Sequence, residues 1–326
     1  MKYVYESAFA TEISRYLRLL SEKGRYIDKI QSSLRSLDSY LVNNGSVQKI
    51  LHSEIITAWI KTRNVSSRTK AMNISHTNGF VKYLVSLGIE ANCPEILKAR
   101  SEYVPYIFSD EELNRIISAA DNFEATAYSI RSALIFPVLL RLLYVCGLRL
   151  GEACNLRWKH VDLERSVLTI KNAKNQKQRF VPMDGSMSIL LKKYKAMTQI
   201  NEMCEEYLFE SDRNPNKPFD KSTFHGWFKK VLGAANIHYA KAHLHERGPC
   251  PHCFRHLFTL KSFLKSESEG RRFEDTSHFL AAYLGHDSPK ELETYLSSNH
   301  SVYTQSHQRV NTALGAMFPE VSFDED

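Results

Sequence analysis

Apolar residues in the first hundred positions recur at steps of three and four, the spacing that places side chains on one face of a helix. Two such sets are visible: Ile27, Ile30, Leu34, Leu37 and Leu41 form the first, and Phe80, Tyr83, Leu84 and Leu87 form the second, which ends at Gly88. Helices with apolar faces bury them against one another, so the pattern predicts a helical bundle.

This pattern is interrupted over residues 93–106, which contain two prolines and show little periodicity. Ser109 follows, and Glu112 lies three residues after it, which is the spacing of a capping box that opens a helix. We therefore predict a helical domain over residues 1–103 and a second domain over residues 104–326.

The second domain combines apolar helices with a small sheet. Residues 133–146 are almost continuously apolar, which predicts a helix that is buried on all sides. Residues 166–170 and 178–181 are short β-type runs separated by a polar segment, the pattern of an antiparallel hairpin. Helical spacing returns around Phe224 and Leu257. The predicted fold class is mainly α with a small antiparallel β-sheet: a helical bundle followed by an α+β domain.

Composition and hydropathy exclude several classes of protein. The 326-residue chain is 43% hydrophobic and 24% charged, which is typical of a folded protein of about two domains. Its longest uncharged apolar run, residues 133–140, is far shorter than the roughly 20 residues needed to cross a bilayer. The N-terminal residues carry Glu6 and Glu12 and lack the cleavage site of a signal peptide. We therefore expect a cytoplasmic protein without a membrane partner.

The net charge of +7 is concentrated in one part of the chain. Residues 1–100 contain 15 Lys and Arg against 8 Asp and Glu, whereas the remaining residues hold 28 of each. A basic domain beside a neutral one favours a nucleic-acid clamp, although a solvated helical surface has the same composition. The cations best placed for phosphate alternate with hydroxyl and amide side chains, and they are Lys61, Arg63, Arg68 and Lys70.

Candidate catalytic residues occur in short motifs of the second domain. Arg149 follows the apolar helix in Gly-Leu-Arg-Leu-Gly-Glu, where an ordinary ion pair with Glu152 is the alternative. His252 and Arg255 lie three residues apart at a predicted helix start, so they share one face of that helix. His286 follows a glycine that is placed as a helix C-cap.

A tyrosine completes this set of polar residues. Tyr295 lies nine residues after His286, in a helix that begins with the capping sequence Ser-Pro-Lys-Glu. Alone it carries no signal, because the chain has 16 tyrosines and Tyr303 is only eight residues further on.

Together these motifs resemble the signature of the tyrosine recombinases, the phage-integrase-like DNA recombinases. The motifs Gly-Leu-Arg-x-x-Glu, His-x-x-Arg-His and Leu-Gly-His, and the tyrosine nine residues later, occur in the family's order and local spacing. The resemblance covers essentially the whole chain, since the N-terminal bundle is similar to the family's core-binding domain. One departure is the long interval from Arg255 to His286, which contains a polar insertion at residues 267–276.

The resemblance implies a catalytic hairpin lysine as well. In the family this lysine lies eight residues before a proline, which corresponds to Lys174 when counted from Pro182, with Lys177 as the alternative. Lys174 would protonate the departing 5′ oxygen, and His286 would bond a phosphate oxygen. Glu152 would orient Arg149 or His252.

The resemblance further implies strand cleavage without a metal or other cofactor. Arg149 and Arg255 would neutralise the phosphate, and Tyr295 would attack it to form a covalent 3′-phosphotyrosine. His252 would accept the phenol proton. The resulting function is that of a site-specific recombinase of the integrase or transposase type, which exchanges strands through a Holliday junction.

The implied partners are double-stranded DNA with specific recombination sites and further copies of the chain. A C-terminal apolar stripe precedes an acidic tail at residues 319–326 and consists of Val310, Ala313, Leu314 and Met317. In the family such a terminal helix commonly docks on a neighbouring subunit, so the resemblance implies a homo-tetramer on DNA, with a monomer or weak oligomer in the free state. Packing of the stripe within one chain is equally compatible. Two other functions stay open: a type IB topoisomerase-like relaxing enzyme and a catalytically idle DNA-binding accessory protein.

A zinc site competes for part of the same sequence. His243, His245, Cys250 and Cys253 could supply four ligands. A single Cys-x-x-Cys is weak, however, and this segment already carries the recombinase motif, so we predict no metal site. Cys146 and Cys154 lie in apolar surroundings and are expected to be reduced thiols.

Overall fold

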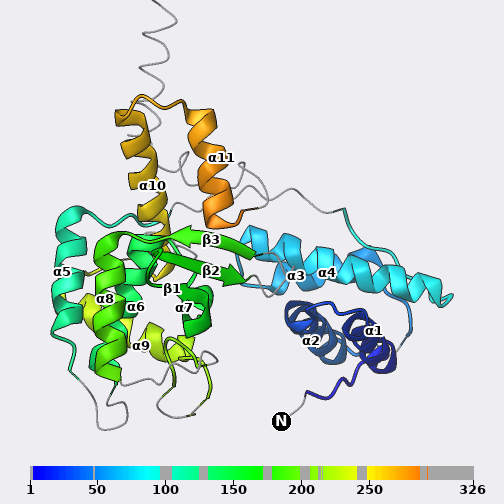
Figure 1. Cartoon of the computed structure of the whole chain (residues 1–326). Helices are drawn as coiled ribbons and strands as arrows, with labels where there is room; N and C mark the ends of the chain where they lie inside the picture. Colours follow the sequence, from blue (N-terminus) through cyan, green and yellow to red (C-terminus); the bar gives the residue numbers. More distant parts are fainter. Residues whose placement is uncertain are drawn as a thin grey trace, which may run out of the picture. The chain divides into compact units, whose positions relative to one another are not determined.

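The computed structural model describes residues 3–46, 48–95, 105–124, 131–171, 178–198, 206–211, 214, 216–240, 248–286 and 292. The chain forms two compact units, Met1–Glu102 and Tyr103–Asp326 (Figure 1). No helix in these described ranges is both long enough and apolar enough to cross a membrane.

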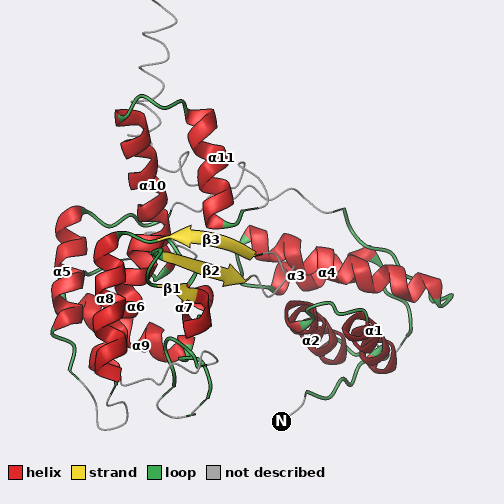
Figure 2. Cartoon of the chain, viewed as in Figure 1, coloured by secondary structure: helices red, strands yellow, loops and turns green. Residues whose placement is uncertain are grey.

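The described part of the first unit is a bundle of helices, as its apolar periodicity predicts (Figure 2). The helices are α1 (Ala10–Glu22), α2 (Asp28–Asn43), α3 (Ser53–Thr62) and α4 (Ser67–Ser86). Leu34 and Leu37 of α2 are fully buried and belong to the same core as Phe80 and Leu84 of α4. Leu87 was expected in this apolar set, but it follows the last turn of α4 and is 49% exposed.

The second unit is built around α6 (Ser132–Cys146), the helix predicted to be buried. The other described helices are α5 (Asp110–Asp121), α7 (Leu150–Cys154), the short 3₁₀ helix η1 (Trp158–His160), α8 (Gly185–Thr198), α9 (Lys221–Ala234), α10 (His252–Ser268) and α11 (Phe273–Leu284). Phe136 of α6 is fully buried and packs against the rings of Phe123 and Phe224. The predicted capping box opens α5, because Ser109 Oγ accepts the Glu112 N–H and the Glu112 carboxylate accepts the Ser109 N–H.

A small antiparallel sheet lies in the second unit, with strand order β1-β2-β3. Its strands are β1 (Val161–Asp162), β2 (Val167–Lys171) and β3 (Gln178–Pro182). The predicted hairpin is confirmed as β2 and β3, whose register pairs Leu168 with Val181 and Ile170 with Arg179. Strand β1 was not predicted, because two residues are too short to show an alternation.

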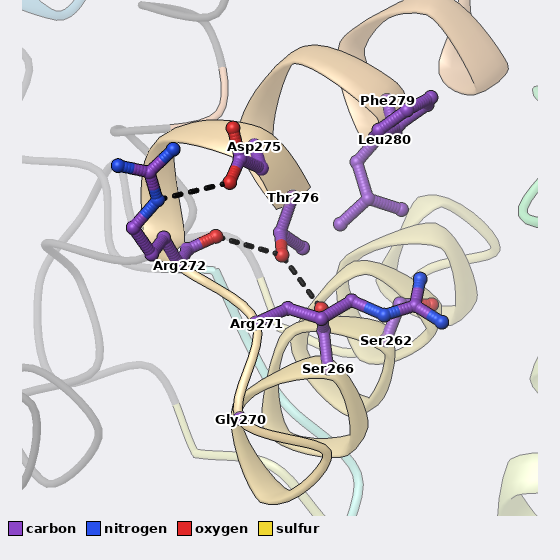
Figure 3. A pocket seen from close by; sticks show the side chains of 9 residues that line it. All are labelled: Ser262, Ser266, Gly270, Arg271, Arg272, Asp275, Thr276, Phe279 and Leu280. Carbon is purple, nitrogen blue, oxygen red and sulfur yellow. Dashed lines mark hydrogen bonds and ion pairs between the residues drawn. The ribbon is translucent and has the colours of Figure 1, made fainter.

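Helices α10 and α11 form an antiparallel pair joined by a tight turn at Gly270, where φ is +76° (Figure 1). The polar segment at residues 267–276 is therefore the end of α10, this turn and the beginning of α11. Beside the turn lies a hollow of about 630 Å³, in which Thr276 Oγ1 is 2.6 Å from Ser266 Oγ (Figure 3). The hollow lies toward the opposite end of α10 from His252 and Arg255.

Candidate active site

Arg149 is held at the start of α7 by its own local sequence. Gly147 ends α6 in a left-handed conformation with φ of 58°, and a Cβ there would lie 2.6 Å from the ring of Phe258. Arg149 then serves as the N-cap of α7, and its N–H donates to the Glu152 carboxylate at 2.9 Å. Its Nη1 donates to the same carboxylate, also at 2.9 Å. The ion pair weighed as the ordinary alternative is therefore present, and it fixes the direction of the arginine.

A second arginine, Arg179, binds the same carboxylate, and it was missed by the sequence analysis. Its Nη1 and Nη2 lie 3.1 and 2.9 Å from the two Glu152 oxygens, and its Nε donates to the Tyr283 carbonyl at 2.8 Å. A usable signal did exist: alternate residues of a strand share one face, so Arg179 shares the face of the buried Val181. A charged residue on the core face of a strand requires a partner.

Glu152 is mostly buried yet remains ionised. Burial alone would raise its pKa, but the hydrogen bond and charge of Arg179, together with those of Arg149, outweigh burial and lower the pKa to about 2. The cluster therefore contains two guanidinium groups and one carboxylate, which leaves a net positive charge.

Arg255 lies on α10 and is fully buried. It donates to the Gly147 carbonyl at 2.9 Å and to the Leu284 carbonyl at 2.7 Å, and its Nη2 lies 2.7 Å from His286 Nε2. These contacts connect the end of α6 with the end of α11, two segments far apart in the sequence.

His286 is positioned by the predicted glycine cap of α11. Gly285 has φ of 69°, and a Cβ at this position would lie 2.9 Å from Arg179 Nη1, so both conformation and space favour glycine. Because a guanidinium group can only donate hydrogen bonds, His286 Nε2 accepts from Arg255. This contact requires a neutral imidazole with its proton on Nδ1.

His252 occupies the first turn of α10, with its side chain exposed and three residues from Arg255. Its ring meets the ring of His256 edge-on, with centroids 4.7 Å apart. Burial, followed by the charges of His252 and Arg255, lowers the pKa of His256 to about 3, so His256 is neutral.

The structure thus brings Arg149 together with Glu152, and Arg255 together with His286. Arg179 joins the two groups, because it binds Glu152 and also the carbonyl of Tyr283, next to Leu284. The remaining predicted residues of this site, Lys174 with its alternative Lys177, and Tyr295 with its alternative Tyr303, lie outside the described residues.

The predicted DNA-facing cations lie in the first unit, at the end of α3 and the start of α4. Lys61 and Arg68 are exposed, and Lys70 is half-buried. Arg63 is also half-buried; it contacts Ser36, and its guanidinium lies 6.0 Å from the Trp59 ring centroid. Packing thus holds Arg63 in place, while Lys61 and Arg68 extend into solvent.

The zinc ligands considered in the sequence are only partly in view. Cys250 and Cys253 are close together, whereas His243 and His245 lie outside the described residues. Within the described ranges, no group of three His, Cys, Asp or Glu side chains is arranged to hold a metal ion.

Comparison with known proteins extends this picture. Residues 107–301, more than half of the chain, match the model of the phage integrase family. The chain belongs to this family, the tyrosine recombinases. This tyrosine recombinase is therefore an enzyme of site-specific DNA recombination.

Two relatives and one solved structure illustrate the similarity. The putative integrase/recombinase y4rB of Sinorhizobium fredii (strain NBRC 101917 / NGR234) is 25% identical over 314 residues, covering 93% of this chain and 97% of y4rB. The tyrosine recombinase XerC of Yersinia pestis is 24% identical over 328 residues, covering 94% of this chain and 97% of XerC. A lambda integrase tetramer bound to a Holliday junction has the same fold, with a TM-score of 0.61 and 18% identity over 86% of this chain and 78% of that one.

Proposed function

We propose that this recombinase, of the integrase or transposase type, cleaves and rejoins DNA through a covalent 3′-phosphotyrosine at Tyr295 and a Holliday junction. The observation that carries the proposal is the convergence of guanidinium groups on the end of α11. Arg255 binds Leu284 directly, and Arg149 is linked to Tyr283 through Glu152 and Arg179. Fixed cations of this kind stabilise the pentacovalent transition state of a phosphodiester, so the reaction needs no metal or cofactor.

In the proposed reaction the Tyr295 oxygen attacks phosphorus, and the bond from phosphorus to the 5′ oxygen breaks. The phenol has an ordinary pKa of about 10, so His252 accepts its proton. Lys174 donates a proton to the departing 5′ oxygen, while Arg149 and Arg255 bind the non-bridging oxygens. The 5′ hydroxyl of a partner strand then attacks the phosphotyrosine and releases Tyr295.

His286 changes its contact when DNA binds. In the free protein its Nε2 accepts a hydrogen bond from Arg255. A phosphate oxygen that binds Arg255 takes over this donor, and His286 then bonds the phosphate as a donor, with its proton on Nε2.

Phosphate contacts away from the cleavage site are assigned to the first unit. Exposed Lys61 and Arg68 reach DNA phosphates, with Lys70 beside them and with Arg63 fixed by its contacts to Ser36 and Trp59. These contacts predict DNA binding that weakens steeply as the salt concentration rises.

The proposal includes a homo-tetramer on DNA and a monomer or weak oligomer in the cytoplasm when DNA is absent. Support comes from two exposed aromatic side chains, Phe180 at 64% and Phe279 at 76%, which line an apolar hollow beside Tyr283. We take this apolar hollow as part of the surface that contacts a neighbouring subunit. The lambda integrase tetramer on a Holliday junction gives a precedent within the same fold.

The decisive experiment traps covalent protein–DNA complexes in cells and sequences the DNA ends, which defines the recombination site for all later assays. Tyr295→Phe is expected to abolish the covalent complex and leave DNA affinity nearly unchanged, because it removes one oxygen and no phosphate contact. Tyr303→Phe is the matched control and should retain the complex. A covalent complex that persists in Tyr295→Phe and disappears in Tyr303→Phe would move the nucleophile to Tyr303.

Relaxation and strand-joining assays on the mapped site, together with the covalent trap, separate the competing functions. An idle DNA-binding protein forms no covalent complex, and a topoisomerase-like enzyme relaxes supercoiled DNA without joining strands from two sites. A recombinase joins strands from two sites.

A further inference from the structure

Two cysteines that the proposed reaction does not use lie at the start of α10. Cys250 and Cys253 are separated by Pro251 and His252, and their Sγ atoms are 3.5 Å apart. Sulfur atoms at this separation are in contact, and a further approach of roughly 1.5 Å would reach the disulfide bond length of about 2.05 Å.

The two thiols differ in environment in a way that suits stepwise oxidation. Cys253 is fully buried, and its Sγ accepts the Cys250 N–H at 3.3 Å. The hydrogen bond with Cys250, together with burial, raises the pKa of Cys253. Cys250 is only half-buried and lies just before the first turn of α10. An oxidant therefore reaches Cys250 first. Cys253 lies in contact with Cys250 and can attack the mixed disulfide that forms there.

Other cysteines of the described chain lack this combination of access and proximity. Cys146 and Cys154 are buried, and burial raises the pKa of each to about 12. Cys93 is half-buried, and burial raises its pKa as well. Access and sulfur contact thus single out the pair at α10.

We propose that Cys250 and Cys253 form a reversible intramolecular disulfide that slows DNA cleavage. The oxidant is a low-molecular-weight disulfide, such as oxidised glutathione. The Cys250 thiolate attacks one glutathione sulfur and releases the first glutathione thiolate. The Cys253 thiol then attacks Cys250 Sγ and passes its proton to the second glutathione sulfur as it leaves, so two protein thiols are oxidised and one glutathione disulfide is reduced to two thiols.

We expect bond formation to shift the turn that carries His252. Cys253 is anchored in the core of the second unit, so closure of the sulfur gap draws Cys250 and the intervening turn toward it. A displacement of about 1 Å in a reacting group can cost on the order of 10²-fold in rate. This consequence rests on the proposed function of His252, whereas formation of the disulfide does not.

The disulfide itself is tested by mass spectrometry on the full-length protein. Arg247 and Arg255 place both cysteines in one tryptic peptide, residues 248–255. After treatment with oxidised glutathione and alkylation of the remaining thiols, this peptide should escape alkylation and lose the mass of two hydrogens, and dithiothreitol should reverse the change.

Variants assign the order of the two steps. Cys253→Ser should accumulate glutathione on Cys250, whereas Cys250→Ser should remain unmodified in this peptide. Cys93→Ser is the matched control and should oxidise like the wild type. A wild-type peptide that keeps a glutathione adduct, or that stays fully alkylatable, overturns the proposal. Stoichiometric zinc on the purified protein, released when the thiols are alkylated, overturns it as well.

The effect on cleavage is measured in single turnover on the mapped DNA site. Oxidised wild type should cleave at least about tenfold more slowly than reduced wild type and recover with dithiothreitol, while Cys250→Ser should be insensitive to oxidised glutathione. A disulfide that forms without any change in the cleavage rate overturns the proposal that the disulfide slows DNA cleavage. A reduced protein that never cleaves, although its disulfide forms as described, contradicts the proposed function and leaves the disulfide established.

Discussion

Arg149 and Arg255 both lie at the start of a helix in the candidate active site, but the protein holds them in different ways. Arg149 shares the Glu152 carboxylate with Arg179, and its side chain is 38% exposed. Arg255 is fully buried and donates to two backbone carbonyl oxygens. A carboxylate offsets part of the charge it orients, whereas a carbonyl oxygen orients a guanidinium group without carrying a net charge. The orientation of Arg149 therefore depends on neighbouring side chains, whereas the orientation of Arg255 depends on the backbone.

This contrast predicts that Arg255→Lys causes the largest loss of cleavage activity. A single ammonium group cannot reach both carbonyl oxygens and His286, so single-turnover cleavage should fall by about 10³-fold or more. The buried ammonium should also lower the urea midpoint of unfolding. DNA affinity should change little, because the charge is retained.

Arg149→Lys is the matched variant in the exposed half of the site. It should lose cleavage with little loss of stability, because an exposed lysine stays solvated. Similar urea midpoints for the two variants would contradict the contrast between a backbone-held and a side-chain-held arginine.

The next effect concerns Lys174, which lies between β2 and β3 in the sequence. If Lys174 is the general acid, Lys174→Ala should slow cleavage by roughly 10²- to 10⁴-fold. A substrate with sulfur in place of the 5′ bridging oxygen should restore the rate, because a thiolate leaves without a proton.

Rescue by sulfur should be selective. Arg149→Ala should gain much less from the same substrate, since its defect lies in the unneutralised phosphate. If Lys177→Ala is rescued while Lys174→Ala cleaves normally, the count from Pro182 is in error and Lys177 is the acid.

A smaller effect is expected for Arg179→Ala, on the order of 10- to 100-fold, because Arg179 acts through Glu152 and touches no reacting atom. Glu152→Gln should cause a similar loss, and the double variant should be no worse than either single one. Additive losses would show that Arg179 works independently of Glu152.

The pH dependence of cleavage gives a second test of the role of Arg179. A purely structural role of Arg179 would leave this dependence unchanged. In the wild type the pKa of Glu152 is about 2, so the carboxylate stays ionised throughout the working range. Removing Arg179 removes the main influence that lowers this pKa, which therefore rises. Cleavage by Arg179→Ala should then be lost at a higher pH than in the wild type as the solution is acidified.

The two arginines also show what sequence could and could not predict. Periodicity predicted the helices of the first unit and the buried α6, and glycine chemistry predicted the cap at Gly285, because each depends on residues close together in the chain. Motifs of local spacing predicted Arg149, Arg255 and His286 as site residues. Arg179 was missed because its contacts to Glu152 and Tyr283 span long stretches of sequence, and only its place on the core face of β3 hinted at them.

The smallest expected effect concerns stability in the buried half of the site. His256 is 4% exposed, and burial, followed by the charges of His252 and Arg255, lowers its pKa to about 3. The unfolded chain binds a proton at an ordinary pKa of about 6.5, so the neutral histidine contributes stability above that pH and loses it as the pH falls toward 3. The loss can reach about 1.4 kcal/mol per pH unit, because one proton separates the two states.

His256→Gln removes this titration and should flatten the decline of unfolding free energy between pH 7 and pH 5, as measured by urea unfolding. His278→Gln, a matched change at an exposed histidine on α11, should keep the wild-type slope. Equal slopes for all three proteins would mean that His256 accepts a proton in the folded state as easily as in the unfolded chain. The buried half would then tolerate a second positive charge beside Arg255, contrary to the difference between the two arginines.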